Sequence, residues 1–141
     1  MNTAVAELMP YLLKEPRPPY HSAIPSKSAH NKQITRIIVH LRDQLRKSNP
    51  NLPMPSHWMI SALVDNASVD SNQNETPIED WQAEVCAILN VIHDACDVGL
   101  DKACPFIHPN GQRPLFPSHE LFDEWDAYRF SQTLLHYLGS L

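Results

Sequence analysis

The sequence predicts an all-α fold, a single-domain bundle of four to five helices with a Pro-rich N-terminal arm and a Pro-rich loop before the last helix. Three observations predict it. Apolar residues recur at helical spacing in several segments, and no segment alternates apolar and polar residues as a strand does. The 13 prolines, against 3 glycines, fall between the apolar runs, where they end helices. The length of 141 residues is close to that of one ordinary domain.

The chain divides into an N-terminal arm, residues 1–27, and a helical domain, residues 28–141. The arm has no strand pattern, and its prolines prevent a regular helix, so we expect it to be partly extended. These prolines are Pro10, Pro16, Pro18, Pro19 and Pro25. We expect the arm to lie along the surface of the domain rather than to reach a partner.

Two helices are predicted in the first half of the domain. The first extends from Ser28 to Ser48, with an apolar face formed by Ile34, Ile37, Ile38, Leu41 and Leu45. It ends at Asn49-Pro50, because proline lacks the amide donor and restricts the residue before it. Ser56 is the predicted N-cap of the second helix. The apolar face of that helix contains Ile60, Leu63, Val64 and Ala67.

The third helix is predicted to start at residues 76–79 (TPIE), which combine an N-cap, a proline at the first helical position and a capping-box glutamate. Its apolar face extends to Cys96, and Gly99 is its expected end. The Pro-rich loop at residues 100–117 follows, with a turn at Asn110-Gly111.

Ser118 is the predicted N-cap of the last helix. One side of this helix is formed by Leu121, Trp125, Tyr128, Leu135 and Leu138. The three tryptophans, Trp58, Trp81 and Trp125, are expected to anchor the core. A tryptophan that is left exposed would instead mark an interface.

Composition excludes several classes of function. The net charge is −5 and the basic residues form no long cluster, so nucleic-acid binding is not expected. No apolar run approaches the length of a membrane span, and the first 13 residues lack the pattern of a signal peptide. Three cysteines without a C-x-x-C pair are not typical of a secreted disulfide framework. We therefore expect a cytoplasmic protein.

One group of residues has the chemistry of a metal or thiol site. His93, Cys96, Cys104 and His108 could supply four zinc ligands with the spacing H-x2-C-x7-C-x3-H, which is not that of a standard zinc finger. The same residues could form a Cys–His nucleophile. The alternative, which we favour, is that Cys96 is a small apolar residue of the core. We therefore predict no cofactor and keep zinc as the alternative.

Several short runs resemble a known family. Residues 37–44 (IIVHLRDQ) lie in a basic-flanked helix, and residues 52–56 (LPMPS) open the next one. Residues 106–110 (FIHPN) and 115–117 (LFP) precede the last helix. In these runs the chain resembles the helical second domain of polymerase-β-like nucleotidyltransferases of the oligoadenylate-synthase and bacterial cyclic-oligonucleotide-synthase type.

The sequence departs from this family in two ways. Residues 41–44 (LRDQ) lack the aromatic residue of the family's corresponding segment. The family's catalytic sheet domain, with its Gly-Ser motif and metal-binding acidic residues, has no counterpart here, and Gly139-Ser140 follows the last helix, where it cannot serve. The resemblance therefore implies a protein that is not an enzyme by itself and that works with a catalytic nucleotidyltransferase chain.

The predicted function is a non-catalytic helical interaction module that binds a protein partner and forms one wall of a nucleotide pocket. Arg36, Arg42 and Arg46 are the candidate phosphate contacts, and Arg42 and Arg46 can share a helix face. The alternative, that these arginines form an ordinary solvated face, is the interpretation we favour. Two other functions stay open: a small zinc- or thiol-dependent enzyme centred on Cys96, Cys104 and His108, and a homo-oligomeric structural protein of a mobile element.

Overall fold

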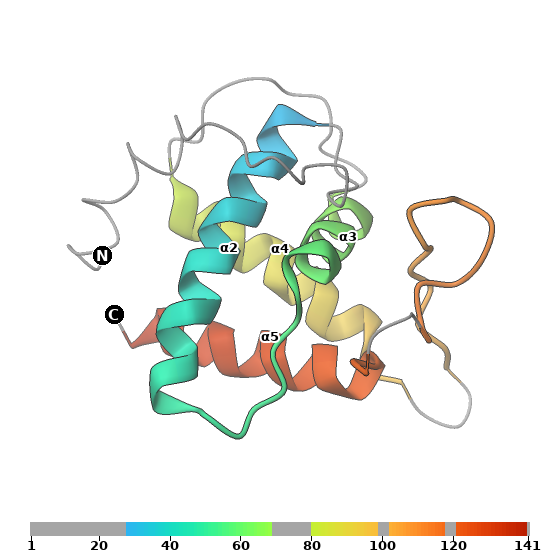
Figure 1. Cartoon of the computed structure of the whole chain (residues 1–141). Helices are drawn as coiled ribbons and strands as arrows, with labels where there is room; N and C mark the ends of the chain where they lie inside the picture. The colour runs from blue at the N-terminus through green and yellow to red at the C-terminus, as the bar shows by residue number, and fades with distance from the viewer. Residues whose placement is uncertain (1–27, 69–79, 99–101, 118–120, 141) are drawn as a thin grey trace.

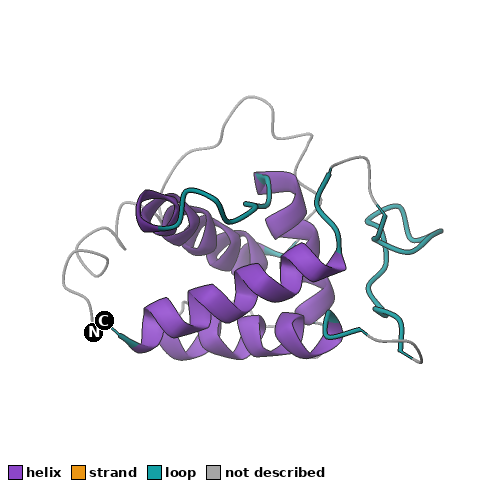
Figure 2. Cartoon of the chain, turned by 90° about the horizontal axis from the view of Figure 1, so that it is seen from below, coloured by secondary structure: helices purple, strands orange, loops and turns teal. Residues whose placement is uncertain are grey.

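The chain folds as an all-α bundle, as predicted. A computed structural model describes residues 28–68, 80–98, 102–117 and 121–140. The helices in these ranges are α2 (Ala29–Ser48), α3 (His57–Ala67), α4 (Trp81–Ala95) and α5 (Glu124–Gly139). Figure 2 shows helices and connecting loops, and no strand, in the described part of the chain. The predicted arm lies outside the described residues.

The first two helices begin and end close to the predicted residues. The Ser28 hydroxyl accepts the Asn31 amide (3.2 Å) and caps α2. The Ser56 hydroxyl accepts the Met59 amide (3.1 Å) and caps α3. A helix leaves its first amides without backbone partners, and a serine hydroxyl satisfies one of them. Ser56 was predicted as a cap, whereas Ser28 was predicted as the first residue of its helix.

The boundaries predicted for α4 were wrong. Asp80 is the N-cap, with a non-helical backbone and a carboxylate that accepts the Ala83 amide (3.1 Å). The helix starts at Trp81, and the predicted TPIE start lies outside the described residues. It ends at Ala95 rather than at Gly99. The next residue, Cys96, is the C-cap, whose amide bonds the Ile92 carbonyl.

The start predicted for α5 was also wrong, and of its predicted apolar side Leu138 is buried and Tyr128 and Leu135 are partly buried, but two residues are not. Asp123 caps the helix and forms a capping box with Asp126, whereas the predicted cap, Ser118, lies outside the described residues. Leu121 is fully exposed and Trp125 is 58% exposed. Phe122, just before the helix, is buried in their place. The buried face of α5 is formed by Ala127, Phe130, Ser131, Leu134 and Leu138.

The helices enclose one apolar core, to which all four contribute. Helices α4 and α5 pack against each other with opposite chain directions (Figure 1). At one end the Gln82 side chain donates to the Leu138 carbonyl (3.2 Å), and at the other the rings of His93 and Tyr128 stack. Within the described ranges, no helix is both long and apolar enough to cross a membrane.

The connection at residues 102–117 lies at one side of the bundle (Figure 1). It turns at Gly111, whose φ of +75° is readily adopted by glycine, which confirms the predicted turn. Phe106, Leu115 and Phe116 from this connection are buried in the core. Asn66 of α3 bonds both peptide groups of Ile107: it donates to the carbonyl and accepts the amide, each at 2.9 Å. The loop is therefore fixed at defined points.

Candidate functional site

The three predicted phosphate contacts, Arg36, Arg42 and Arg46, all lie on α2, and Arg36 and Arg42 both act electrostatically on His57 of α3. Arg42 forms an ion pair with Asp43 (2.9 Å) and donates to the Pro55 carbonyl (3.1 Å). Its side chain is only 14% exposed. Arg46 is exposed in the last turn of α2. A ligand would therefore compete with Asp43 for the Arg42 guanidinium.

A titratable side chain missed by the sequence analysis lies beside this pair of arginines. His57, the first residue of α3, has a lowered pKa, chiefly because burial disfavours its charged form and then because Arg42 and Arg36 repel it. Its neighbours in space come from α2, so the sequence offered no local signal for the group. The arrangement is a positively charged corner of the surface where α2 passes the start of α3.

The lowered pKa of His57 predicts a pH dependence of stability. The unfolded chain binds a proton near the ordinary histidine pKa of about 6.5, and the folded chain binds it only at lower pH. The contribution of His57 to the free energy of unfolding is therefore fully present above the unfolded-state pKa. It is lost as the pH falls toward the folded-state pKa. We expect His57→Gln to retain more of its stability than the wild type between pH 7 and pH 5, measured by urea unfolding. The exposed His136→Gln serves as the control; an equal effect there would contradict the prediction.

The four predicted metal ligands do not form one site. Among the described residues no three His, Cys, Asp or Glu side chains lie where they could hold a metal ion together. The His108 ring packs against Trp58 in a tilted arrangement, with centroids 5.4 Å apart and planes 51° apart, and its Nδ1 accepts the Asn110 amide. His93 stacks on Tyr128 instead. Of the four, the structure brings only the two cysteines into contact.

Cys96 and Cys104 form a pair of free thiols with an Sγ–Sγ distance of 3.9 Å. Cys96 is fully buried, as its place on the apolar face predicted, whereas Cys104 is partly exposed. The pKa of Cys96 is raised, first by its hydrogen bond to Cys104 and then by burial. The pKa of Cys104 is lowered, chiefly by the hydrogen bond from Cys96, against the opposing effect of burial. Deprotonation is therefore favoured at Cys104.

Three aromatic rings stack in series across α4 and α5. Trp125 stacks on Tyr128 with centroids 5.4 Å apart and planes 13° apart. Tyr128 in turn stacks on His93 of α4, with centroids 4.5 Å apart. The Asp94 carboxylate lies 3.2 Å from the His93 Nδ1. We call Trp125, Tyr128 and His93 the aromatic stack; its outer ring, Trp125, is the largest exposed apolar side chain of the described residues.

Four acidic residues lie close to members of the aromatic stack along the chain. Asp123 and Asp126 form the capping box in the turn that holds Trp125, and Glu124 precedes the indole in the sequence. Asp94, beside His93, is 81% exposed in its side chain. Negative charge in a first helical turn also stabilises the helix dipole. We call Asp94, Asp123, Glu124 and Asp126 the acidic rim; Arg129, close enough to Asp126 to act on it electrostatically, adds one positive charge in the next turn of α5.

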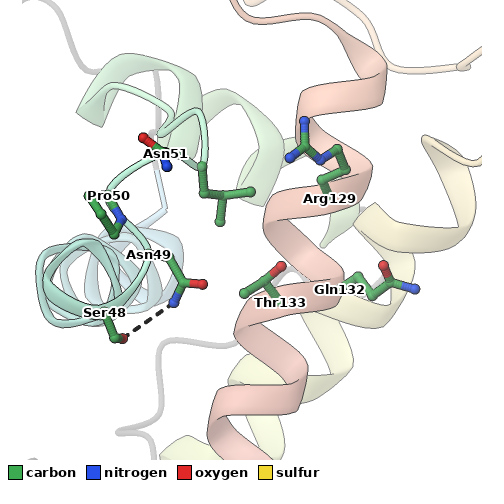
Figure 3. A pocket seen from close by; sticks show the side chains of 8 residues that line it. Ser48, Asn49, Pro50, Asn51, Arg129, Gln132 and Thr133 are labelled. Carbon is green, nitrogen blue, oxygen red and sulfur yellow. Dashed lines mark hydrogen bonds between the residues drawn. The ribbon is translucent and has the colours of Figure 1, made fainter.

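A shallow polar hollow of about 410 Å³ lies between the end of α2 and α5 (Figure 3). It is lined by residues 48–52 and by Arg129, Gln132 and Thr133. Thr133 points toward Asn49, whereas Gln132 points away from it. Asn49 donates to the Ser48 hydroxyl (3.3 Å). The lining set holds one charged side chain and no nucleophile paired with a base, so the hollow offers no catalytic arrangement.

Comparisons with protein-family models, with curated proteins and with solved structures give no match to this chain.

Proposed function

We propose that this protein is a non-catalytic helical module that binds a protein partner through the exposed end of the aromatic stack. The observation that carries the proposal is the 58% exposure of Trp125 in a domain that buries its other large aromatic residues at least partly. An indole left in water is unfavourable unless a partner covers it, and tryptophan is enriched among the residues that dominate interface energetics.

The stack also restricts the indole before binding. Trp125 lies one turn from Tyr128 on α5, and the Tyr128 ring is held between the indole and His93. A side chain that already has one orientation loses less entropy when a partner immobilises it. Leu121, fully exposed just before the helix, adds a second apolar side chain in the same stretch of chain.

The charges on this face define the chemistry of the partner. An acidic rim around an apolar centre is complementary to an apolar pocket edged by lysine or arginine. Oppositely charged rims accelerate association, and added salt reduces this effect. We therefore expect a partner with a basic surface and a pocket of indole size.

The resemblance adds an expectation about the identity of this partner. It suggests a catalytic nucleotidyltransferase chain, with this module forming one wall of the nucleotide pocket. In that arrangement the corner formed by Arg36, Arg42 and His57 is the part of the module suited to a phosphate, because guanidinium groups bind phosphate with strong charge-assisted hydrogen bonds. This role requires Arg42 to exchange its pairing with Asp43 for the ligand.

Trp125→Ala is expected to weaken partner binding by about thirtyfold, the loss typical of a central interface tryptophan. The immobilised wild-type chain is incubated with extract of the native cells, and recovered proteins are identified by mass spectrometry. Each candidate is then purified, and its Kd for the wild type and the variant is measured by calorimetry. A genuine partner binds in one-to-one stoichiometry and loses affinity in higher salt.

Val91→Ala is the matched control. Val91 is also an exposed apolar residue, at 44%, but it lies two positions before His93 on α4 and so on a different side of that helix. Its replacement is expected to change the Kd less than twofold. Equal affinities for wild type and Trp125→Ala would overturn the proposal. If Trp125→Ala instead dissociates a dimer of this chain in sedimentation, the homo-oligomeric alternative replaces it.

A further inference from the structure

Two thiols from separate segments meet near the start of α5. Cys96 caps the end of α4, and Cys104 belongs to the connection that follows. Their sulfur atoms are 3.9 Å apart, and Glu124 of α5 is close enough to act electrostatically on both. A disulfide requires a separation of about 2.05 Å, so the sulfurs would have to approach by roughly 2 Å. A change of this size is within reach of side-chain rotation and a small shift of the loop.

The two thiols differ in accessibility and in acidity. Cys104 is partly exposed, whereas Cys96 is completely buried behind it. The Cys104 thiolate is stabilised by the hydrogen bond from Cys96 and, to a smaller extent, by the Phe106 amide and by Lys102. Since the thiolate is the nucleophilic form of cysteine, a small electrophile meets the reactive sulfur first.

We propose that Cys104 and Cys96 form a thiol–disulfide site that hydrogen peroxide oxidises, with Cys104 as the attacking residue and Cys96 as the resolving residue. The Cys104 thiolate attacks one peroxide oxygen, an S–O bond forms, and the O–O bond breaks. The departing hydroxide takes a proton and becomes water, which leaves Cys104 as a sulfenic acid.

The second step closes the disulfide. The Cys96 sulfur attacks the Cys104 sulfur, the S–O bond breaks, and the hydroxyl group leaves as water with the proton from the Cys96 thiol. Two thiols have then lost two electrons, and one peroxide has become two waters. Since the bond joins the loop to the end of α4, oxidation would add a covalent link between two parts of the fold. The proposal does not depend on partner binding.

The third cysteine provides an internal control. Cys86 lies on α4 ten residues before Cys96, about 15 Å along the helix, so it cannot pair with Cys96 without unfolding. Its thiol is partly exposed, and burial followed by the charge of Asp80 raises its pKa. Exposure alone would make Cys86 as reactive as Cys104, whereas the proposed geometry makes Cys104 react first.

The test uses the full chain carrying Cys86→Ser, reduced and then treated with a small molar excess of hydrogen peroxide. Whole-protein mass spectrometry should show loss of two hydrogens and loss of both alkylatable thiols, reversed by dithiothreitol. Cleavage before Asp94 and Asp97 separates Cys96 from the rest of α4 and identifies the linked peptides. Adding Cys104→Ser should slow thiol loss by about tenfold.

The Cys96→Ala variant separates the two steps. It keeps an apolar group in the buried site, and circular dichroism checks its fold. Treated with peroxide, it should gain one oxygen at Cys104 that a sulfenic-acid probe traps, with no disulfide. Three results would overturn the proposal: no intramolecular bond in the Cys86→Ser chain, oxidation of Cys86 before Cys104 in the wild type, or an unchanged rate of thiol loss with Cys104→Ser.

Discussion

Replacing Phe130 with alanine is expected to lower the free energy of unfolding by about 3–5 kcal/mol, the range for deleting a buried phenylalanine. Phe130 is 2% exposed and is among the largest fully buried side chains of the structure. It lies in the middle of α5, between Ala127 and Leu134 on the buried face. The loss combines apolar surface returned to water with a cavity that neighbouring side chains fill only in part.

Urea unfolding measures this effect. The free energies of unfolding of the wild type and the variant are compared on condition that both show the same slope of free energy against urea concentration. Trp125→Ala provides the control on the same helix. It removes a larger side chain, but an exposed one, so the expected cost is no more than its stacking with Tyr128, about 0.5–1.5 kcal/mol. If Phe130→Ala and Trp125→Ala lowered the free energy of unfolding equally, α5 would not bury the side with Phe130 and expose the side with Trp125.

Asn31→Ala is expected to lower the free energy of unfolding by about 2 kcal/mol. The Asn31 amide donates to the Asp65 carboxylate (2.8 Å) and to the Ser68 hydroxyl (2.7 Å), which ties the start of α2 to the end of α3. Asn31 is 8% exposed and Ser68 6% exposed. Without the Asn31 amide, the Asp65 carboxylate and the Ser68 hydroxyl lose this donor while they stay partly or wholly buried. The free-energy cost of their lost solvation is larger than the net contribution of an ordinary hydrogen bond to stability.

Asn90→Ala is the matched control for Asn31→Ala. The Asn90 amide bonds only the Cys86 carbonyl in its own helix (2.9 Å), and its side chain is exposed. Alanine also has the higher helix propensity, so the expected change lies within about 0.5 kcal/mol in either direction. Thermal or urea unfolding of both variants checks the difference. If Asn90→Ala lowered the free energy of unfolding as much as Asn31→Ala, the hydrogen bonds between α2 and α3 would contribute no more to stability than an exposed hydrogen bond within one helix.

The sequence predicted those parts of the fold that local chemistry determines. Ser56 was predicted as a cap because it precedes an apolar helical pattern and needs only its own next residues to act, whereas Ser28, predicted as the first residue of its helix, is the cap of that helix. The TPIE signal before α4 was equally complete, yet the helix starts at Trp81 behind the Asp80 cap. A capping sequence indicates that a helix can begin at a given residue, but tertiary packing determines which of several possible starts is used.

The face of α5 could not be chosen from periodicity alone. Two sets of apolar residues have suitable spacing, one that starts at Leu121 and Trp125 and one through Phe130 and Leu134. The structure buries Phe130 and Leu134 and leaves Leu121 and Trp125 exposed. The small residue Ala127, fully buried beside Phe130, was the available signal for close helix approach.

The chemistry of the candidate sites depends on distances that spacing does not give. The sequence grouped Cys96 and Cys104 with two histidines, but the loop path places the sulfurs in contact and both imidazoles elsewhere. Likewise, His57 lies beside Arg36 and Arg42 only because α3 packs on α2. The nucleotidyltransferase resemblance stays a prediction that no comparison tests.

The Asn66 contact has a consequence for how the loop at residues 102–117 can vary. The Asn66 amide bonds the peptide group of Ile107, not its side chain, and His108 and Arg113 are likewise joined through their backbones (2.8 Å). These backbone bonds do not depend on the side chains of Ile107, Pro109, Gln112 and Arg113, whereas the side chains of His108 and Asn110 accept backbone amides within the turn. Substitutions at those four exposed positions would therefore alter the displayed surface while the backbone stays in place, provided that His108, Asn110 and Gly111 are kept.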